Sequence, residues 1–267
     1  MSNTIFRDQN SVTTILAIRN QLAANLGIAF TIDNATTINT KHGVLADTQP
    51  TSFPKIRYFG IGIKGYANLT SEDNISQPYM PSAEDCDLYE PIPFRVVPVS
   101  SPLTDIEAEQ YRIRTTINKN GNDYYAYWLK KIVFESNVAK TTKIIDGVES
   151  DYTVSATNLN PIPNDLYPSE LNDSENRIVA SVTGICRVTG EEIIEVANIL
   201  YGGDMRRMRV SEFGTYSGCE VTTADGRKEA AYVQLCTHKC TLGQTLSNPT
   251  DVLVERKVFE NGSCVVI

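Results

Sequence analysis

Two turn dipeptides, Asn120-Gly121 and Asp146-Gly147, constrain the fold of this chain more than any other feature. The first lies inside "YRIRTTINKNGNDYYAYWLKKIVF" (111–134), between two runs rich in β-branched and aromatic residues. The second separates "TTKII" from "VESDYTV". Such dipeptides favour the positive φ angles of two-residue hairpin turns. The sequence therefore predicts antiparallel β-hairpins.

Other segments extend this pattern. Strand-like runs cover 57–65, 177–188, 205–213, 230–242 and 252–259. Helical signals are fewer: a capping-box pattern at Thr104-x-x-Glu107, and a segment over 189–203 with acidic residues at its start and two glycines at its end. The predicted fold class is α+β and β-dominated, with antiparallel hairpins and sheet, two or three short helices and long Pro-rich loops.

A further helix is predicted within 10–27. Its apolar residues Ile15, Ile18, Leu22 and Leu26 recur near the helical period, Asn10 or Ser11 can cap its start, and Gly27 suits its end. A single apolar stripe needs a partner, in this chain or in another.

We expect two regions: residues 1–100, an N-terminal helix with an extended Pro-rich arm, and residues 101–267, a β-rich α+β domain. The two can also form one continuous domain. No strong regular element is indicated over 28–56, and 158–176 reads as a long Pro-rich loop.

The passage 66–102 contains six prolines, which disfavour helices and central strands. Long passages without clear elements are usually functional. Because aromatic side chains anchor interfaces, Tyr79, Tyr89 and Phe94 are predicted to contact a neighbouring subunit. The acidic cluster Glu84, Asp85, Asp87 and Glu90 lacks the order of a calcium loop and is expected to be solvated or to meet basic residues of a partner.

The overall charge excludes some classes of protein. A net charge of -8 disfavours nucleic acid and anionic membranes as partners. The chain has no apolar run long enough to span a membrane and starts without a secretory signal. Its densest basic stretch is "MRRMR" (205–209), and Arg206, Arg207 and Arg209 are therefore candidates for an interface with an acidic partner.

Six cysteines without a C-x-x-C motif indicate reduced thiols in a cytosol. Cys236, His238 and Cys240 alternate in "CTHKC", which would place them on one face of a strand. A structural zinc site needs four ligands, and the sequence shows no second pair. Residues two apart on a strand also diverge, so they do not predict a cysteine–histidine catalytic pair. We expect no metal and no cofactor here.

Gly60, Gly62 and Gly65 match the dinucleotide pattern G-x-G-x-x-G, but no helix follows them. Strand alternation explains the pattern better, with bare glycines that allow another segment to approach closely. A Gly62→Val substitution should then impair folding or assembly. No other enzyme motif is present, and the chain is expected not to be an enzyme.

Four stretches together resemble virion structural proteins of tailed bacteriophages: "KIRYFGIGIKGYANL", "QPYMPSAEDCDLYEPIPFRVVP", "YYAYWLKKI" and "ANILYGGDMRRMRVSEFGTYSG". The resemblance spans most of the chain and carries no catalytic residue. It implies a component of the tail or baseplate, or alternatively of the neck or collar. It also implies assembly in the host cytoplasm through contacts with other virion proteins and with copies of itself.

Two other classes stay open. A carbohydrate- or receptor-binding module would use exposed aromatic residues, for which Tyr124, Tyr125, Tyr127 and Trp128 are candidates. An enzyme of unrecognised type would depend on His238 and the acidic cluster.

Overall fold

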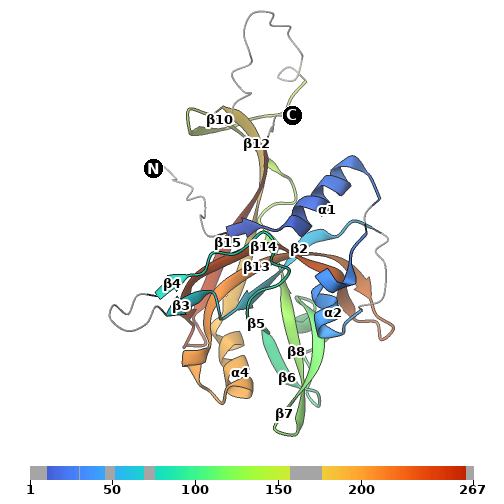
Figure 1. Ribbon diagram of the computed structural model, residues 1–267, viewed down its shortest axis with the longest axis vertical. Helices are drawn as coiled ribbons and strands as arrows, with labels where there is room; N and C mark the ends of the chain where they lie inside the picture. Colours follow the sequence, from blue (N-terminus) through green and yellow to red (C-terminus); the bar gives the residue numbers. More distant parts are fainter. Residues whose placement is uncertain (1–10, 30, 46–51, 69–75, 157–175, 263–267) are drawn as a thin grey trace, which may run out of the picture. The chain divides into compact units, whose positions relative to one another are not determined.

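The computed structural model describes residues 11–29, 31–45, 52–68, 76–156 and 176–262 (Figure 1). The described part divides into two compact units, Met1–Ile132 with Arg187–Leu253 and Val133–Cys186 with Val254–Ile267. The expected boundary near residue 100 is therefore wrong. It fails because strands on both sides of residue 100 hydrogen-bond to one another in a single sheet.

The first unit is built on an eight-stranded sheet. Its strands are β1 (Ser11–Thr13), β2 (Lys55–Gly62), β5 (Pro91–Ile92), β6 (Arg95–Pro98), β7 (Tyr111–Lys119), β8 (Asn122–Lys131), β13 (Arg209–Thr222) and β14 (Lys228–Thr245). Their order is β1-β14-β13-β2-β8-β6, with β5 beside β2 and β7 beside β8. The pairs are antiparallel, and the predicted hairpin at Asn120-Gly121 joins β7 to β8.

The second unit contains a five-stranded sheet. Its strands are β9 (Val133–Phe134), β10 (Lys140–Ile145), β11 (Val148–Asp151), β12 (Arg177–Thr189) and β15 (Val252–Gly262). The order is β11-β10-β12-β15, with β9 beside β12. The hairpin predicted at Asp146-Gly147 joins β10 to β11. The Pro-rich loop predicted at 158–176 lies outside the described residues, apart from Asn176.

Four α-helices are described: α1 (Ile15–Leu26), α2 (Ile38–His42), α3 (Asp105–Ala108) and α4 (Gly190–Leu200). The predicted capping box of Thr104 and Glu107 is present in α3, and α4 starts with a second capping box, Thr189 with Glu192, that was not predicted. With about half of the described residues in strands and far fewer in helices, the predicted β-dominated α+β class is confirmed. Among the described residues, no helix combines the length and the apolar composition needed to cross a bilayer.

Three local predictions were wrong. Helix α1 is capped by Thr14, because residues 11–13 instead pair with β14 as β1. Segment 28–56 contains α2 and the 3-10 helix η1 (Asn34–Thr36), each started by a side-chain cap from Thr37 or Asp33. Residues Met205–Arg207 form the 3-10 helix η2, and the strand begins only at Arg209, because Asp204 caps the turn before it.

The passage 66–102 is more regular than expected. It contributes β5 and β6 to the large sheet, and its remaining strands β3 (Tyr66–Asn68) and β4 (Ser76–Pro78) form a small hairpin sheet. Three of the six prolines, Pro78, Pro91 and Pro98, lie at strand ends, where a missing N–H removes no ladder bond, and the other three lie outside strands. Much of this passage therefore packs within its own subunit.

Gly60 and Gly62 lie in β2, as predicted, and other segments approach them closely. A Cβ atom at Gly62 would stand 2.4 Å from Oε2 of Glu212 and 2.8 Å from the carbonyl oxygen of Glu90. The neighbouring Gly65 is equally restricted, since its Cβ would meet the backbone of Ser211. Both glycines thus allow the 82–90 segment and β13 to close around one buried carboxylate.

Candidate functional site

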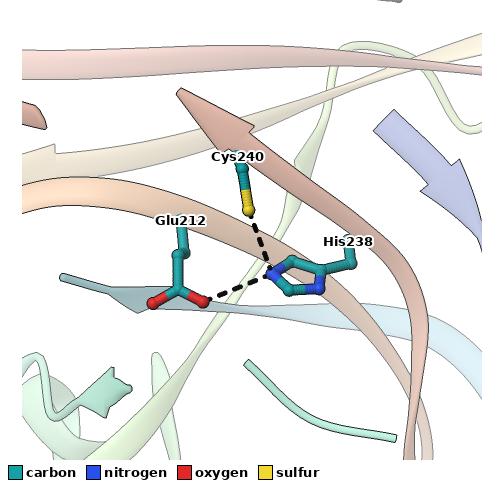
Figure 2. A group of neighbouring side chains, drawn as sticks. All are labelled: Glu212, His238 and Cys240. Atoms are coloured by element: carbon teal, nitrogen blue, oxygen red, sulfur yellow. Dashed lines mark hydrogen bonds and ion pairs between the residues drawn. The ribbon is translucent and has the colours of Figure 1, made fainter. Parts of the chain in front are cut away.

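A buried polar centre forms where β13 and β14 meet the segment 82–90 (Figure 2). Glu212 on β13 lies opposite Cys240 on β14, and His238 lies two residues before Cys240 on β14. The side chains of Glu212, His238 and Cys240 are fully buried. A polar cluster with no solvent access needs internal partners for each group.

The imidazole of His238 supplies most of these contacts. Its Nδ1 lies 2.7 Å from Oδ2 of Asp85, and its Nε2 lies 3.3 Å from Oε1 of Glu212 and 3.6 Å from Sγ of Cys240. The ring of Tyr89 packs edge-on against it, with centroids 4.7 Å apart. His238 therefore connects the acidic segment to both strands.

Backbone amides hold the carboxylate of Glu212. Oε2 accepts hydrogen bonds from the N–H groups of Lys64 and Glu90, and Oε1 accepts one from Tyr89, at 2.7–3.2 Å. Burial favours the protonated acid, but the hydrogen bonds from His238 and these three amides outweigh it and hold the pKa of Glu212 below its usual range. Glu212 is thus a carboxylate.

The same partners act on the histidine. Burial alone would lower the pKa of His238, but hydrogen bonds with Cys240, Glu212 and Asp85 raise it to about 10. Without any bound ion, the centre is a buried imidazolium between two carboxylates. Such a centre ties three chain segments together.

The acidic cluster predicted in 84–90 is only partly solvated. Asp85 bonds His238, while Asp87 accepts a hydrogen bond from the hydroxyl of Tyr216 at 3.0 Å and pairs with Lys41. These carboxylates are thus satisfied by their own chain. The sequence could not indicate this, because their partners are 46 to 153 residues away.

The triad Cys236, His238 and Cys240 is not kept together. Cys236 instead contacts the carbonyl oxygen of Gln234 through its sulfur, while Glu212 takes the place beside His238. The sequence shows no second ligand pair, but the folded sheet brings a third ligand-type side chain, Glu212, beside His238 and Cys240. Glu212 was missed because only strand pairing places it opposite Cys240.

The predicted interface residues fall into two groups. Phe94 is 0% exposed and packs against Phe59 at a centroid distance of 5.0 Å, so it is part of the core and leaves the candidate interface. Tyr79 and Tyr89 are about two-fifths exposed and contact each other edge to face. They remain available to a partner.

The basic residues lie on the surface with partners of their own. Arg206 pairs with Asp204, and the guanidinium groups of Arg207 and Arg209 stack over Tyr201 and Tyr66. Of the aromatic residues considered for glycan binding, Tyr127 is buried, and the indole of Trp128 bonds Thr115. Tyr124 and Tyr125 are partly exposed, and the guanidinium of Arg114 lies over the Tyr125 ring at 4.3 Å from its centroid.

Helix α1 presents a second feature of interest. It packs on β14 through Asn20 and Ala23, and the amide of Asn20 donates to the side chain of Gln234 at 2.7 Å. The predicted apolar stripe faces away from the sheet. Its members are between 49% and 63% exposed, and Ile28 continues it; they are Ile15, Ile18, Leu22 and Leu26. Within the described residues, this apolar row is therefore uncovered.

Comparison with known proteins identifies a family but no activity. No curated protein and no solved structure matches the chain significantly. A model described as a family of unknown function, DUF7208, matches residues 1–241, a span that includes α1 and the whole His238 centre. The chain is therefore a member of the DUF7208 family.

Proposed function

We propose that the protein is a structural component of a tailed-phage virion, in the tail or baseplate, that acts through contacts between subunits. The observation that carries the proposal is the exposed apolar row of α1, defined by Ile15, Ile18, Leu22 and Leu26. The resemblance of the sequence to virion structural proteins supplies the setting.

An outward apolar row is unfavourable for an isolated subunit. Covering a half-exposed leucine or isoleucine contributes roughly 1 kcal/mol, so the row gives several such increments to an assembled state. Contiguous exposed apolar surface of this kind typically marks an interaction site.

The partner proposed for the row is a second copy of the chain. The chain has a net charge of -8, so two copies repel each other over most of their surfaces. Helix α1 contains no acidic residue, and its one charged residue, Arg19, already donates to the carbonyl oxygen of Thr31. The row is thus a place where two copies can meet without opposing carboxylates.

Oligomeric state tests the contact. The full chain should self-associate in light scattering coupled to size exclusion, and Leu22→Glu should shift it to monomers. Ala24→Glu is the matched control, because Ala24 is exposed on the same helix but about half a turn away from the row. A monomeric wild-type chain, or equal effects of the two variants, would contradict the self-contact.

Location in the particle tests the setting. Mass spectrometry of purified particles should detect the chain, and gold labelling of a tagged copy should mark the tail or baseplate. Label at the neck or collar would instead assign the protein to that part of the virion. Absence from particles would refute the virion assignment. Tyr79 and Tyr89 are proposed as further contact residues, and no catalytic step is assigned.

A further inference from the structure

The His238 centre has a geometry that hydrogen bonds alone explain poorly. Figure 2 shows Oε1 of Glu212 and Sγ of Cys240 both directed at Nε2 of His238. A ring nitrogen carries at most one proton, so its single N–H would be shared between the carboxylate and a sulfur that is only a weak acceptor. An ion placed between the three atoms would satisfy all of them.

The separations agree with such an ion. A tetrahedral zinc ion has bonds of about 2.0 Å to nitrogen and oxygen and about 2.3 Å to sulfur, which places N and O about 3.3 Å apart and N and S about 3.5 Å apart. The observed distances are 3.3 Å from Nε2 to Oε1 and 3.6 Å from Nε2 to Sγ. All three ligand atoms lie within 4.8 Å of one another.

The outer contacts are also those of a metal site. Asp85 lies 2.7 Å from Nδ1 of His238, an arrangement that fixes a proton on Nδ1 and leaves the Nε2 lone pair for a metal. The amides of Lys64, Tyr89 and Glu90 occupy three of the four acceptor positions of Glu212. The fourth, on Oε1, faces His238.

We propose that Glu212, His238 and Cys240 bind one divalent zinc ion. A thiolate with an imidazole and a carboxylate favours zinc, whereas magnesium and calcium prefer oxygen ligands alone. Binding replaces the thiol proton of Cys240 and any proton on Nε2, which leave to solvent, and a water molecule completes four-coordination. The bound ion joins β13 to β14, and Asp85 connects the segment 82–90 to it through Nδ1 of His238.

This proposal replaces the expectation from the sequence that the segment holds no metal. That expectation counted ligands along the chain, whereas Glu212 and Asp85 reach His238 only in the folded sheet. The proposal does not depend on the virion assignment.

The test uses the full chain, unfolded in guanidinium with a chelator and refolded with or without zinc. After desalting, elemental analysis should find one zinc per chain in the zinc-refolded sample. Refolding with cobalt should give the thiolate-to-cobalt absorption band. Cys240→Ser should lose that band and bind zinc at least tenfold more weakly.

Cys236→Ser is the matched control, since Cys236 is a buried cysteine of the same strand that lies outside the cluster. It should keep both the band and the zinc. The proposal is overturned if wild-type chain refolded with zinc holds none, which leaves the imidazolium pairing as the whole explanation. It is also overturned if Cys240→Ser keeps the cobalt–thiolate band. Because wild-type chain alone can give the first result, the test does not depend on whether a variant folds.

Discussion

Replacing Gly62 with alanine tests how tightly the His238 centre is built. The added Cβ would lie 2.4 Å from Oε2 of Glu212 and 2.8 Å from the carbonyl oxygen of Glu90, both far inside van der Waals contact. The carboxylate must therefore move. Its Oε2 accepts hydrogen bonds from the amides of Lys64 and Glu90, and these two bonds would be lost or stretched.

The magnitude follows from those two bonds. A hydrogen bond to a charged group contributes about 1.5–3 kcal/mol, so Gly62→Ala should lower the free energy of unfolding by roughly 3–6 kcal/mol. Gly60→Ala is the matched control on the same strand. Its Cβ would meet only side chains, with Tyr216 nearest at 3.0 Å, and overpacking of that kind costs about 1–3 kcal/mol.

Urea unfolding of both variants in a chelator separates this effect from metal binding. The Gly62 variant should be the less stable by about 2.5 kcal/mol, the difference between the midpoints of the two ranges. In a Glu212→Ala background, Gly62→Ala should do less harm, because the clashing carboxylate is gone. Equal stability of the two glycine variants, or an undiminished effect in that background, would refute the reasoning.

Three further perturbations test other buried groups. The pKa of His42 is lowered from 6.5 to about 4, mainly by burial. The charge of Asp87 partly opposes this shift, and the charge of Lys41 adds to it. The free energy of unfolding should thus fall by up to about 3 kcal/mol as the pH drops from 6.5 towards 4. His42→Phe keeps a ring against Trp128. Its free energy of unfolding, measured over the same pH range, should not show this fall. Parallel pH profiles of the two proteins would contradict it. Lys130→Met removes the ammonium that lies 2.6 Å from the buried carboxylate of Glu192, so it should lower the free energy of unfolding by about 3–5 kcal/mol in chemical denaturation. Lys140→Met breaks the exposed pair with Asp151 and should not change that free energy measurably. The side-chain amide of Asn39 donates to the carbonyl oxygens of Val44 and Ala230. Asn39→Asp puts an oxygen against these carbonyls, so it should lower the melting temperature more than Asn39→Ala. The reverse order would show that these bonds do not matter.

The sequence alone determined several of the local elements. The hairpins at Asn120-Gly121 and Asp146-Gly147 and the capping boxes of α3 and α4 rest on residues within a few positions of each other. Their signals are backbone preferences and side-chain caps, which act over a single turn. The sequence also shows the helical period of the apolar row of α1, although it does not show which side of the helix faces the sheet.

Only the tertiary structure decided how distant segments combine. Strand β2 pairs with β13 more than 140 positions further along the chain, as Gly62 opposite Glu212 shows, and this pairing and that of β6 with β8 overturned the expected boundary near residue 100. Phe94 could be an interface anchor or a core residue by sequence, and the sheet made it core. In the same way, Glu212 meets His238 because β13 and β14 pair, and Asp85 reaches it because the 82–90 segment folds back. Such contacts depend on side chains that meet across strands, and single-chain periodicity describes only one strand at a time.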